Sequence, residues 1–162
     1  MIKLKKETYL IILFVISLSA LMSAYIIQYL LGYQPCNLCL IERIPYILSL
    51  IILILNFKFK ENQKFFNVLL FLIFLFSLLI SIYHFGIEQG LVPDSDTCSY
   101  NNNSLLITKD DILKSFQEVT ISCKDVAFKI FGFSLTSYNI LISLIMILIS
   151  IKIYLINDKI KK

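Results

Sequence analysis

The sequence predicts an all-α integral membrane protein: a four-helix transmembrane bundle with two loops on its outer side, the second carrying short interfacial helices. Hydrophobic residues make up 58% of the 162 residues and charged residues only 16%, whereas about a quarter of an ordinary globular domain is charged. Four long apolar runs alternate with polar segments. The lysines gather just outside these runs instead of along one polar face, which indicates membrane topology and argues against nucleic-acid binding.

The predicted spans cover about residues 9–31, 40–57, 65–85 and 134–156. A spanning helix needs about 20 predominantly apolar residues, and the first, third and fourth runs meet this length comfortably. The second run is marginal, but the polar NFKFKENQK that follows it is typical of a short turn between two helices. Since no repeat or low-complexity linker interrupts the chain, we expect a single membrane domain over residues 1–162.

The first run follows a basic segment, MIKLKKE, as the core of a signal peptide would. Its apolar stretch is longer than the about 7–15 residues of such a core, and no small-residue cleavage site ends it. We therefore predict a retained span.

Lysine placement predicts the orientation of the bundle. The lysines outside the long loop lie before the first run, between the second and third runs, and in and after the end of the fourth run: Lys3, Lys5, Lys6, Lys58, Lys60, Lys64, Lys152, Lys159, Lys161 and Lys162. With four spans these three places share one side, which the positive-inside rule puts in the cytoplasm together with both termini. The loops at about 32–39 and 86–133 then face outward.

Two pieces of the long loop have a pattern of their own. In TKDDILKSFQEV, Thr108 is suited to cap a helix whose apolar residues Ile112, Phe116 and Val119 share one face. VAFKIFGF is apolar apart from one lysine. Both are compatible with amphipathic pieces in the membrane interface and with a small helical cap outside the membrane, and the sequence leaves the two open.

All four cysteines fall in the outward loops: Cys36 and Cys39 in the short one, Cys98 and Cys123 in the long one. The even count and the location favour an oxidising compartment and two pairs, Cys36–Cys39 and Cys98–Cys123. The first pair closes a very small ring of the kind that is usually redox-active. The second closes a loop worth about 3 kcal/mol in the entropy model. It is either a structural staple or an exchange partner, and exchange is favoured by its polar flanks and mostly by the CxxC on the same side of the membrane.

A zinc site made of all four thiolates is a further interpretation. The second pair lacks the close spacing of a zinc knuckle, so we expect no metal.

Arg43 is the only arginine, and it lies one helical turn after Cys39. Its guanidinium could stabilise a thiolate or hydrogen-bond a carbonyl of a small molecule held between helix ends. Alternatively it extends to the interface and pairs with Glu42 or a lipid phosphate.

His84 is the only histidine, at the outward end of the third span, at the depth of Arg43. The two could frame a pocket for an oxidised, membrane-soluble electron acceptor, or His84 is simply interfacial. Glu88 lies one turn further, where it either assists proton transfer or is solvated.

PCNLCLIER, followed by YHFGIE and by a separated cysteine pair in a second loop, resembles the disulfide bond formation protein B (DsbB) family. The resemblance covers essentially the whole chain. The family signature C-x-x-C-x-x-x-R corresponds here to Cys36, Cys39 and Arg43. It implies a quinone-dependent thiol oxidase of the bacterial inner membrane, and a specialised DsbI-type member fits nearly as well.

The resemblance also implies roles for the residues. A reduced periplasmic DsbA-like oxidase of the thioredoxin fold would attack the Cys98–Cys123 disulfide and form a mixed disulfide with Cys98. Exchange with Cys36–Cys39 would follow, and the electrons would pass to ubiquinone or menaquinone, with Cys39 as the contact. Arg43 and His84 would bind that quinone. Two alternatives are an enzyme similar to quinone-epoxide reductases and a non-enzymatic membrane protein with two structural disulfides.

Overall fold

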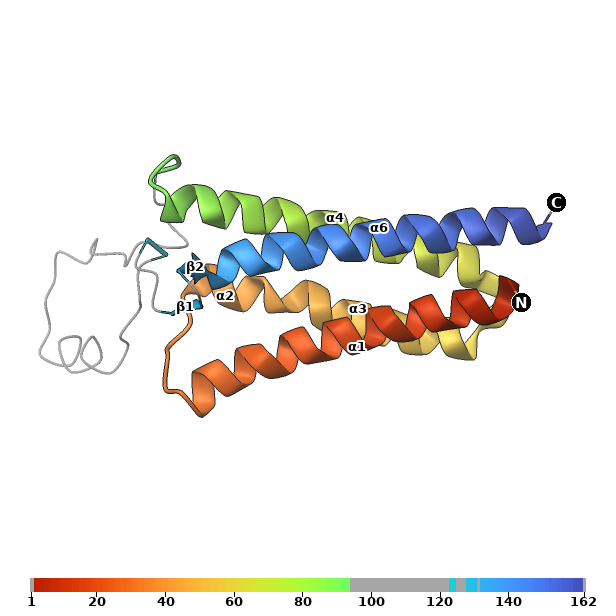
Figure 1. Cartoon of the computed structure of the whole chain (residues 1–162), viewed down its shortest axis with the longest axis horizontal. Coiled ribbons are helices and arrows are strands. Elements are labelled where there is room, and N and C mark those ends of the chain that lie inside the picture. Colours follow the sequence, from red (N-terminus) through yellow and green to blue (C-terminus); the bar gives the residue numbers. More distant parts are fainter. Residues whose placement is uncertain (1, 94–122, 125–127, 131, 162) are drawn as a thin grey trace, which may run out of the picture.

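The computed structural model describes residues 2–93, 123–124, 128–130 and 132–161. Four long helices run side by side along the long axis of the molecule (Figure 1): α1 (Ile2–Tyr29), α3 (Arg43–Lys58), α4 (Gln63–Glu88) and α6 (Leu135–Lys161). The short helix α2 (Asn37–Ile41) precedes α3, and the 3-10 turn η1 (Lys60–Asn62) joins α3 to α4. The predicted all-α four-helix architecture is confirmed.

The four helical segments are long and apolar enough to cross a membrane: Lys6–Tyr29, Asn37–Lys58, Gln63–Glu88 and Leu135–Ile156. Their outer faces expose large apolar side chains, such as Phe65 at 67% and Leu148 at 61%. Such a surface is unfavourable in water and suited to lipid. The chain is therefore a multi-pass membrane protein, and both termini lie at one end of the bundle (Figure 1).

The long loop is described only in part. The expected helix around residues 108–119 lies outside the described residues. In the second candidate segment, β1 (Lys129–Ile130) pairs antiparallel with β2 (Phe133–Ser134), so a short hairpin stands where an interfacial helix was expected. Gly132 in its turn has φ +84°, a conformation that glycine adopts without strain.

Polar pairs connect the helices inside an otherwise apolar core. Ser17 accepts a hydrogen bond from Ser49 at 3.0 Å, joining α1 to α3, and the hydroxyls of Ser77 and Ser143 join α4 to α6 at 3.1 Å. Lipid tails offer no hydrogen-bond partners, so polar groups inside a membrane bundle find one another and fix how the helices pack. These pairs set the rotation of each helix, and with it the side chains that face the site.

The break between α2 and α3 also positions the site. Pro45 in the first turn of α3 has no N–H, and its ring excludes a regular helical bond to the carbonyl of Ile41. The helix is accordingly interrupted at Glu42, which ends α2. Glu42 keeps backbone angles close to helical (φ −62°, ψ −17°), and its largely buried side chain contacts His84 of α4.

Candidate functional site

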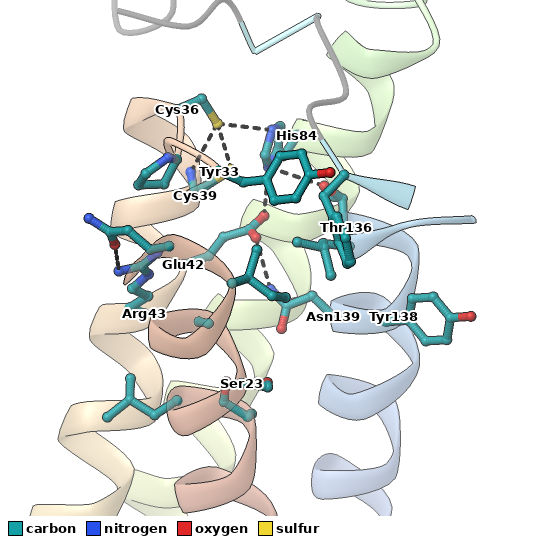
Figure 2. A pocket seen from close by; sticks show the side chains of 18 of the residues that line it. Ser23, Tyr33, Cys36, Cys39, Glu42, Arg43, His84, Thr136, Tyr138 and Asn139 are labelled. Carbon is teal, nitrogen blue, oxygen red and sulfur yellow. Dashed lines mark hydrogen bonds and ion pairs between the residues drawn. The ribbon is translucent and has the colours of Figure 1, made fainter. Parts of the chain in front are cut away.

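A cavity of about 190 Å³ opens between α1, α2, α3, α4 and α6, at the end of the bundle opposite the termini (Figure 2). It brings together five of the six side chains that the sequence predicted for the site: Cys36, Cys39, Cys123, Arg43 and His84. The sixth, Cys98, lies outside the described residues. The remaining walls are largely apolar, with Ala20, Ala24, Ile27, Leu135 and Ile142 among them.

Cys36 and Cys39 begin the second span. Cys36 is the N-cap of α2, and its Sγ accepts the backbone N–H of Cys39 at 3.3 Å. Both are free thiols whose sulfur atoms lie 2.7 Å apart, whereas the sulfurs of a disulfide are about 2.03–2.05 Å apart. The pair can therefore interconvert between dithiol and disulfide with little movement of either side chain.

Cys36 is the more acidic of the two thiols. The hydrogen bond from the Cys39 thiol, assisted by the hydrogen bond and charge of His84, lowers the pKa of Cys36 to about 4, although burial opposes the shift. A thiolate is the reactive form of cysteine. Cys36 is therefore ready for thiol–disulfide exchange at neutral pH, and the groups that stabilise its charge are Cys39 and His84. Stabilisation of Cys36 by Arg43, considered from the sequence, is not seen among the described contacts.

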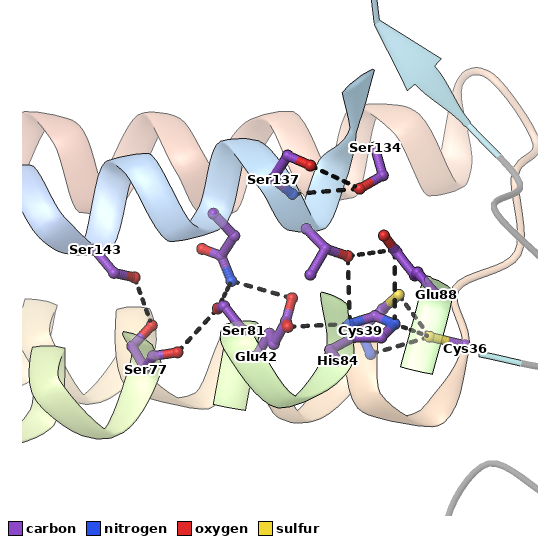
Figure 3. Close-up of polar contacts among 12 residues, drawn as sticks. Cys36, Cys39, Glu42, Ser77, Ser81, His84, Glu88, Ser134, Ser137 and Ser143 are labelled. Carbon is purple, nitrogen blue, oxygen red and sulfur yellow. Dashed lines mark hydrogen bonds and ion pairs between the residues drawn. The ribbon is translucent and has the colours of Figure 1, made fainter. Parts of the chain in front are cut away.

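His84 connects Cys36 to a buried carboxylate (Figure 3). Its Nε2 lies 3.5 Å from the sulfur of Cys36, and its Nδ1 lies 3.0 Å from Oε1 of Glu42. The imidazole is only 2% exposed, so it points into the bundle and not into the interface. A thiol, an imidazole and a carboxylate in this order are the parts of an activated cysteine nucleophile.

Glu42 is in turn held from the last helix. Its Oε2 accepts a hydrogen bond from Nδ2 of Asn139 at 3.0 Å, and the same amide donates to Ser81 at 2.8 Å. Tyr46 donates its hydroxyl to Oδ1 of Asn139. The carboxylate that orients His84 therefore has a fixed position, determined by α3, α4 and α6 together.

One interpretation of the sequence was that Glu88 is solvated, but its side chain is buried in the structure. Its side chain is only 6% exposed, and Oε1 accepts the hydroxyl of Thr136 at 2.5 Å. Sequence reasoning missed the roles of Thr136, Asn139 and Glu42. For α4 and α6 the sequence does contain a pattern that could have indicated these contacts, because polar residues repeat at helical spacing on one face of each apolar helix. They are Ser77, Ser81, His84 and Glu88 on α4, and Thr136, Asn139 and Ser143 on α6.

Arg43, the first residue of α3, lines the cavity, and its guanidinium packs against α1. Its Nη1 donates to Oε1 of Gln28 at 2.6 Å, and its guanidinium carbon lies 5.1 Å from the centre of the Tyr25 ring, within the range of a cation–π contact. Within the described part of the chain, Gln28 is its only hydrogen-bond partner and Glu42 pairs elsewhere. Arginine has five N–H donors, so Arg43 is held in place with donors left for a ligand.

Cys123 lies in the wall of the same cavity. It is disulfide-bonded and 2% exposed, and it belongs to one buried apolar cluster with Cys36, Leu38 and Ile87. The residues next to Cys123 in the sequence are polar, yet Cys123 is buried beside the CxxC. The long loop therefore delivers a disulfide sulfur to the neighbourhood of Cys36, as exchange between the two pairs requires.

A metal ion is a second use for such a cluster. The sulfurs of Cys36 and Cys39 and a ring nitrogen of His84 all lie within 4.8 Å of one another. Two thiolates on a tetrahedral zinc, each about 2.3 Å from the metal, lie considerably further apart than the 2.7 Å seen here. The geometry of this pair suits a disulfide better than a metal.

The family model described as disulfide bond formation protein DsbB matches residues 6–153. An uncharacterised protein of Rickettsia prowazekii (strain Madrid E), RP370, is 34% identical over 151 residues, which cover 90% of this chain and 87% of the relative. No solved structure matches the chain.

Proposed function

Because the chain belongs to the DsbB family, whose members are thiol:disulfide oxidoreductases of disulfide bond formation, we propose that it reoxidises a periplasmic DsbA-like oxidase and passes the electrons to a membrane quinone. The observation that carries this proposal is that one cavity is lined by both thiols of the CxxC, by Cys123, and by Arg43 and His84. No observation favours the epoxide-reductase or purely structural alternatives.

The first half of the reaction is two exchanges between sulfur atoms. A thiolate of the reduced partner attacks Cys98, Cys123 leaves as the thiol, and the second partner thiol resolves the mixed disulfide. The reduced Cys98 and Cys123 then reduce the Cys36–Cys39 disulfide in the same way. Each exchange breaks one S–S bond and forms another, so two electrons and two protons arrive at Cys36 and Cys39. The burial of Cys123 in one cluster with Cys36 supports this order.

The second half needs an oxidant, and the cavity fits a quinone. The walls are mostly apolar, as a substituted ring requires, and Arg43 offers free N–H donors to a carbonyl oxygen. A groove between α1 and α6, lined by Ile16, Ser19, Ala20, Ser23, Ile142 and Ile145, shares three of these residues with the cavity. Small side chains there leave room for an isoprenoid tail to reach the lipid.

A bound quinone supplies the two-electron oxidant, and the residues of the chain do the rest. Arg43 orients the carbonyl oxygen and stabilises negative charge that develops on it. Cys39, by analogy with the family, contacts the ring. Glu42 holds His84 against Cys36, so that the imidazole can take the proton of Cys36 and stabilise the thiolate from which the disulfide forms. The CxxC stands at the head of a membrane span because its oxidant is soluble in lipid.

The test is an anaerobic turnover assay. Purified full-length protein is mixed with a reduced thioredoxin-fold dithiol oxidase and a water-soluble ubiquinone analogue, and the loss of quinone absorbance is followed. We expect stoichiometric quinone reduction that Cys39→Ser and Cys98→Ser abolish. If ubiquinone and menaquinone analogues both stay oxidised while the protein is shown to be folded, the proposed function is wrong.

A further inference from the structure

Two carboxyl groups flank the buried imidazole of His84, and their surroundings differ (Figure 3). Glu42 has both oxygens engaged, one by His84 and one by Asn139. Glu88 has only Oε1 engaged: it accepts the Thr136 hydroxyl and lies 4.0 Å from Nε2 of His84. Its Oε2 is buried and has no hydrogen-bond partner among the described residues.

An unpartnered carboxyl oxygen in a protein interior is unfavourable, and such atoms need an explanation. Glu88 lines the same cavity as Cys36 and Cys39 and stands one turn beyond His84 on α4. Among the described residues, then, no donor occupies the lone pairs of Oε2, at the edge of a site whose reaction must move protons. Glu42 has no such vacancy, because fixed donors already occupy both of its oxygens.

The charge beside His84 changes during the proposed reaction. In the reduced protein the sulfur of Cys36 faces Nε2 at 3.5 Å, so the imidazole is placed to take the proton that leaves the thiol. When Cys36 and Cys39 form a disulfide, the two electrons leave and the negative charge on Cys36 disappears. The imidazolium then no longer faces an anion at Nε2, and the acceptor that remains on that side is the carboxylate of Glu88.

We propose that Glu88 accepts this proton from Nε2 of His84 and passes it to the reduced quinone. The inference rests on the proposed function, because the quinone is the electron acceptor that makes the proton leave. The balance closes: Cys36 and Cys39 lose two electrons and two protons, the quinone gains both, and one proton travels through His84 and Glu88. Glu88 thus acts through His84 and not on the reacting sulfur.

The groups that can titrate around Glu88 come from several elements. His84 is on the same helix, and the α2–α3 segment contributes Cys36, Cys39 and Glu42. On α6, Thr136 donates to Glu88 and is neutral, and Tyr138 of α6 and Tyr46 of α3 also line the cavity. Arg43 lines the cavity from the side of α1, where it is bonded to Gln28. When Glu88 is replaced, a change in the pH dependence of quinone reduction must therefore be distinguished from the titration of these neighbouring groups.

The experiment is a single turnover of reduced full-length protein with the ubiquinone analogue, followed by stopped flow over a pH series. Glu88→Gln keeps the size and the acceptor for Thr136 but carries no proton. We expect it to slow quinone reduction by about 100-fold, the lower end of what a positioned acid or base contributes, and to change the pH profile. Glu88→Asp should retain part of the rate. The same change at an exposed position, Glu61→Gln, should have no effect.

Chemical rescue distinguishes a proton relay from a structural role. In Glu88→Ala, added formate should restore the rate in proportion to its concentration, because a small carboxylate can occupy the space left by the side chain. A wild-type rate and pH profile in Glu88→Gln, or no rescue of Glu88→Ala by formate, would overturn the proposal.

A measurement on the wild-type protein serves if these variants do not fold. The infrared difference spectrum between the reduced protein and protein oxidised by a soluble disulfide should show a protonated carboxyl band on oxidation, and its absence would overturn the proposal. Failure of the proposed function is recognised separately, because wild-type protein would then not reduce the quinone at all.

Discussion

The two ends of the bundle both bury polar side chains, yet they differ in what those side chains can do. At the end near the termini, Asn56 donates to Asn67 at 3.0 Å between α3 and α4, and Lys6 donates to Gln63. At the other end, Glu42, His84 and Glu88 surround a cavity with two free thiols. Oδ1 of Asn56 and Nδ2 of Asn67 are also buried without partners among the described residues.

A buried, unpartnered polar atom alone therefore does not mark a functional site. Amides neither titrate nor carry electrons near neutral pH, so the asparagine pair serves helix packing. Carboxyl, imidazole and thiol groups titrate, and thiols also give up electrons when they form a disulfide. At the cavity these groups lie within reach of one another. Between the two ends, Leu53, Phe74 and Met146 are almost fully buried and form an apolar layer. Changes at the two ends should consequently separate activity from stability.

The largest expected effect is the loss of turnover in Cys36→Ser. Serine keeps the N-cap acceptor of α2 but cannot form a disulfide, so electrons have no route from the partner to the quinone. Quinone reduction should fall below detection while the helical circular dichroism and the melting temperature stay near those of the wild type. Equal loss of fold and activity would assign the pair to stability instead.

A smaller effect, of about 100-fold, is expected in the rate at which Cys36 reacts with an alkylating reagent at acidic pH. Its pKa of about 4 lies below the about 8.5 of a free thiol, so its reactivity persists as pH falls and is lost only as pH approaches 4. At pH 6, alkylation by iodoacetamide in a Cys98→Ser, Cys123→Ser background should exceed that of an ordinary thiol of equal access by about 100-fold.

Cys39→Ala is the matched control for that measurement, because it removes the hydrogen bond that contributes most to the low pKa of Cys36. Its alkylation profile should move toward higher pH. An unchanged profile would mean that His84 and the backbone N–H of residue 39 stabilise the thiolate without the Cys39 thiol.

Arg43→Ala should weaken the binding of the quinone by about tenfold. Arg43 lines the cavity, and a hydrogen bond to a charged group contributes about 1.5–3 kcal/mol. We expect a higher KM for the quinone analogue with an unchanged rate of exchange with the dithiol partner, measured by quenching the mixed disulfide. Gln28→Ala, which removes only the support of Arg43, should give a smaller shift in the same direction. A slower exchange step would place Arg43 with the cysteines instead.

The smallest expected effect on activity is at the terminal end. Asn67→Ala leaves Nδ2 of Asn56 without its acceptor, so the free energy of unfolding should fall by about 1–3 kcal/mol. Turnover per folded molecule should not change, because Asn67 lies on the first turns of α4, far along the helix from His84. Denaturation in detergent micelles measures the first quantity and the anaerobic assay the second. A loss of turnover would mean that the two ends are coupled.

Much of the fold could be predicted from the sequence because bilayer thickness fixes the length of apolar runs and lysines mark their ends. The CxxC and Arg43 could be found because their spacing is local. The partners of these residues could not, since they depend on how each helix is rotated. Gln28 meets Arg43 only because α1 packs beside α3, and Glu42 meets His84 only because α3 packs beside α4.

The most direct test of the central claim is the stoichiometry of one turnover. Reduced protein with Cys98→Ser and Cys123→Ser, in which the disulfide cannot move to the second pair, is mixed anaerobically with one equivalent of the ubiquinone analogue. Quinone absorbance and the Cys36–Cys39 disulfide, by mass spectrometry, are measured on the same sample. We predict one quinone reduced for each disulfide formed in that pair. A disulfide that forms without loss of quinone, or quinone loss while Cys36 and Cys39 stay reduced, would contradict the account.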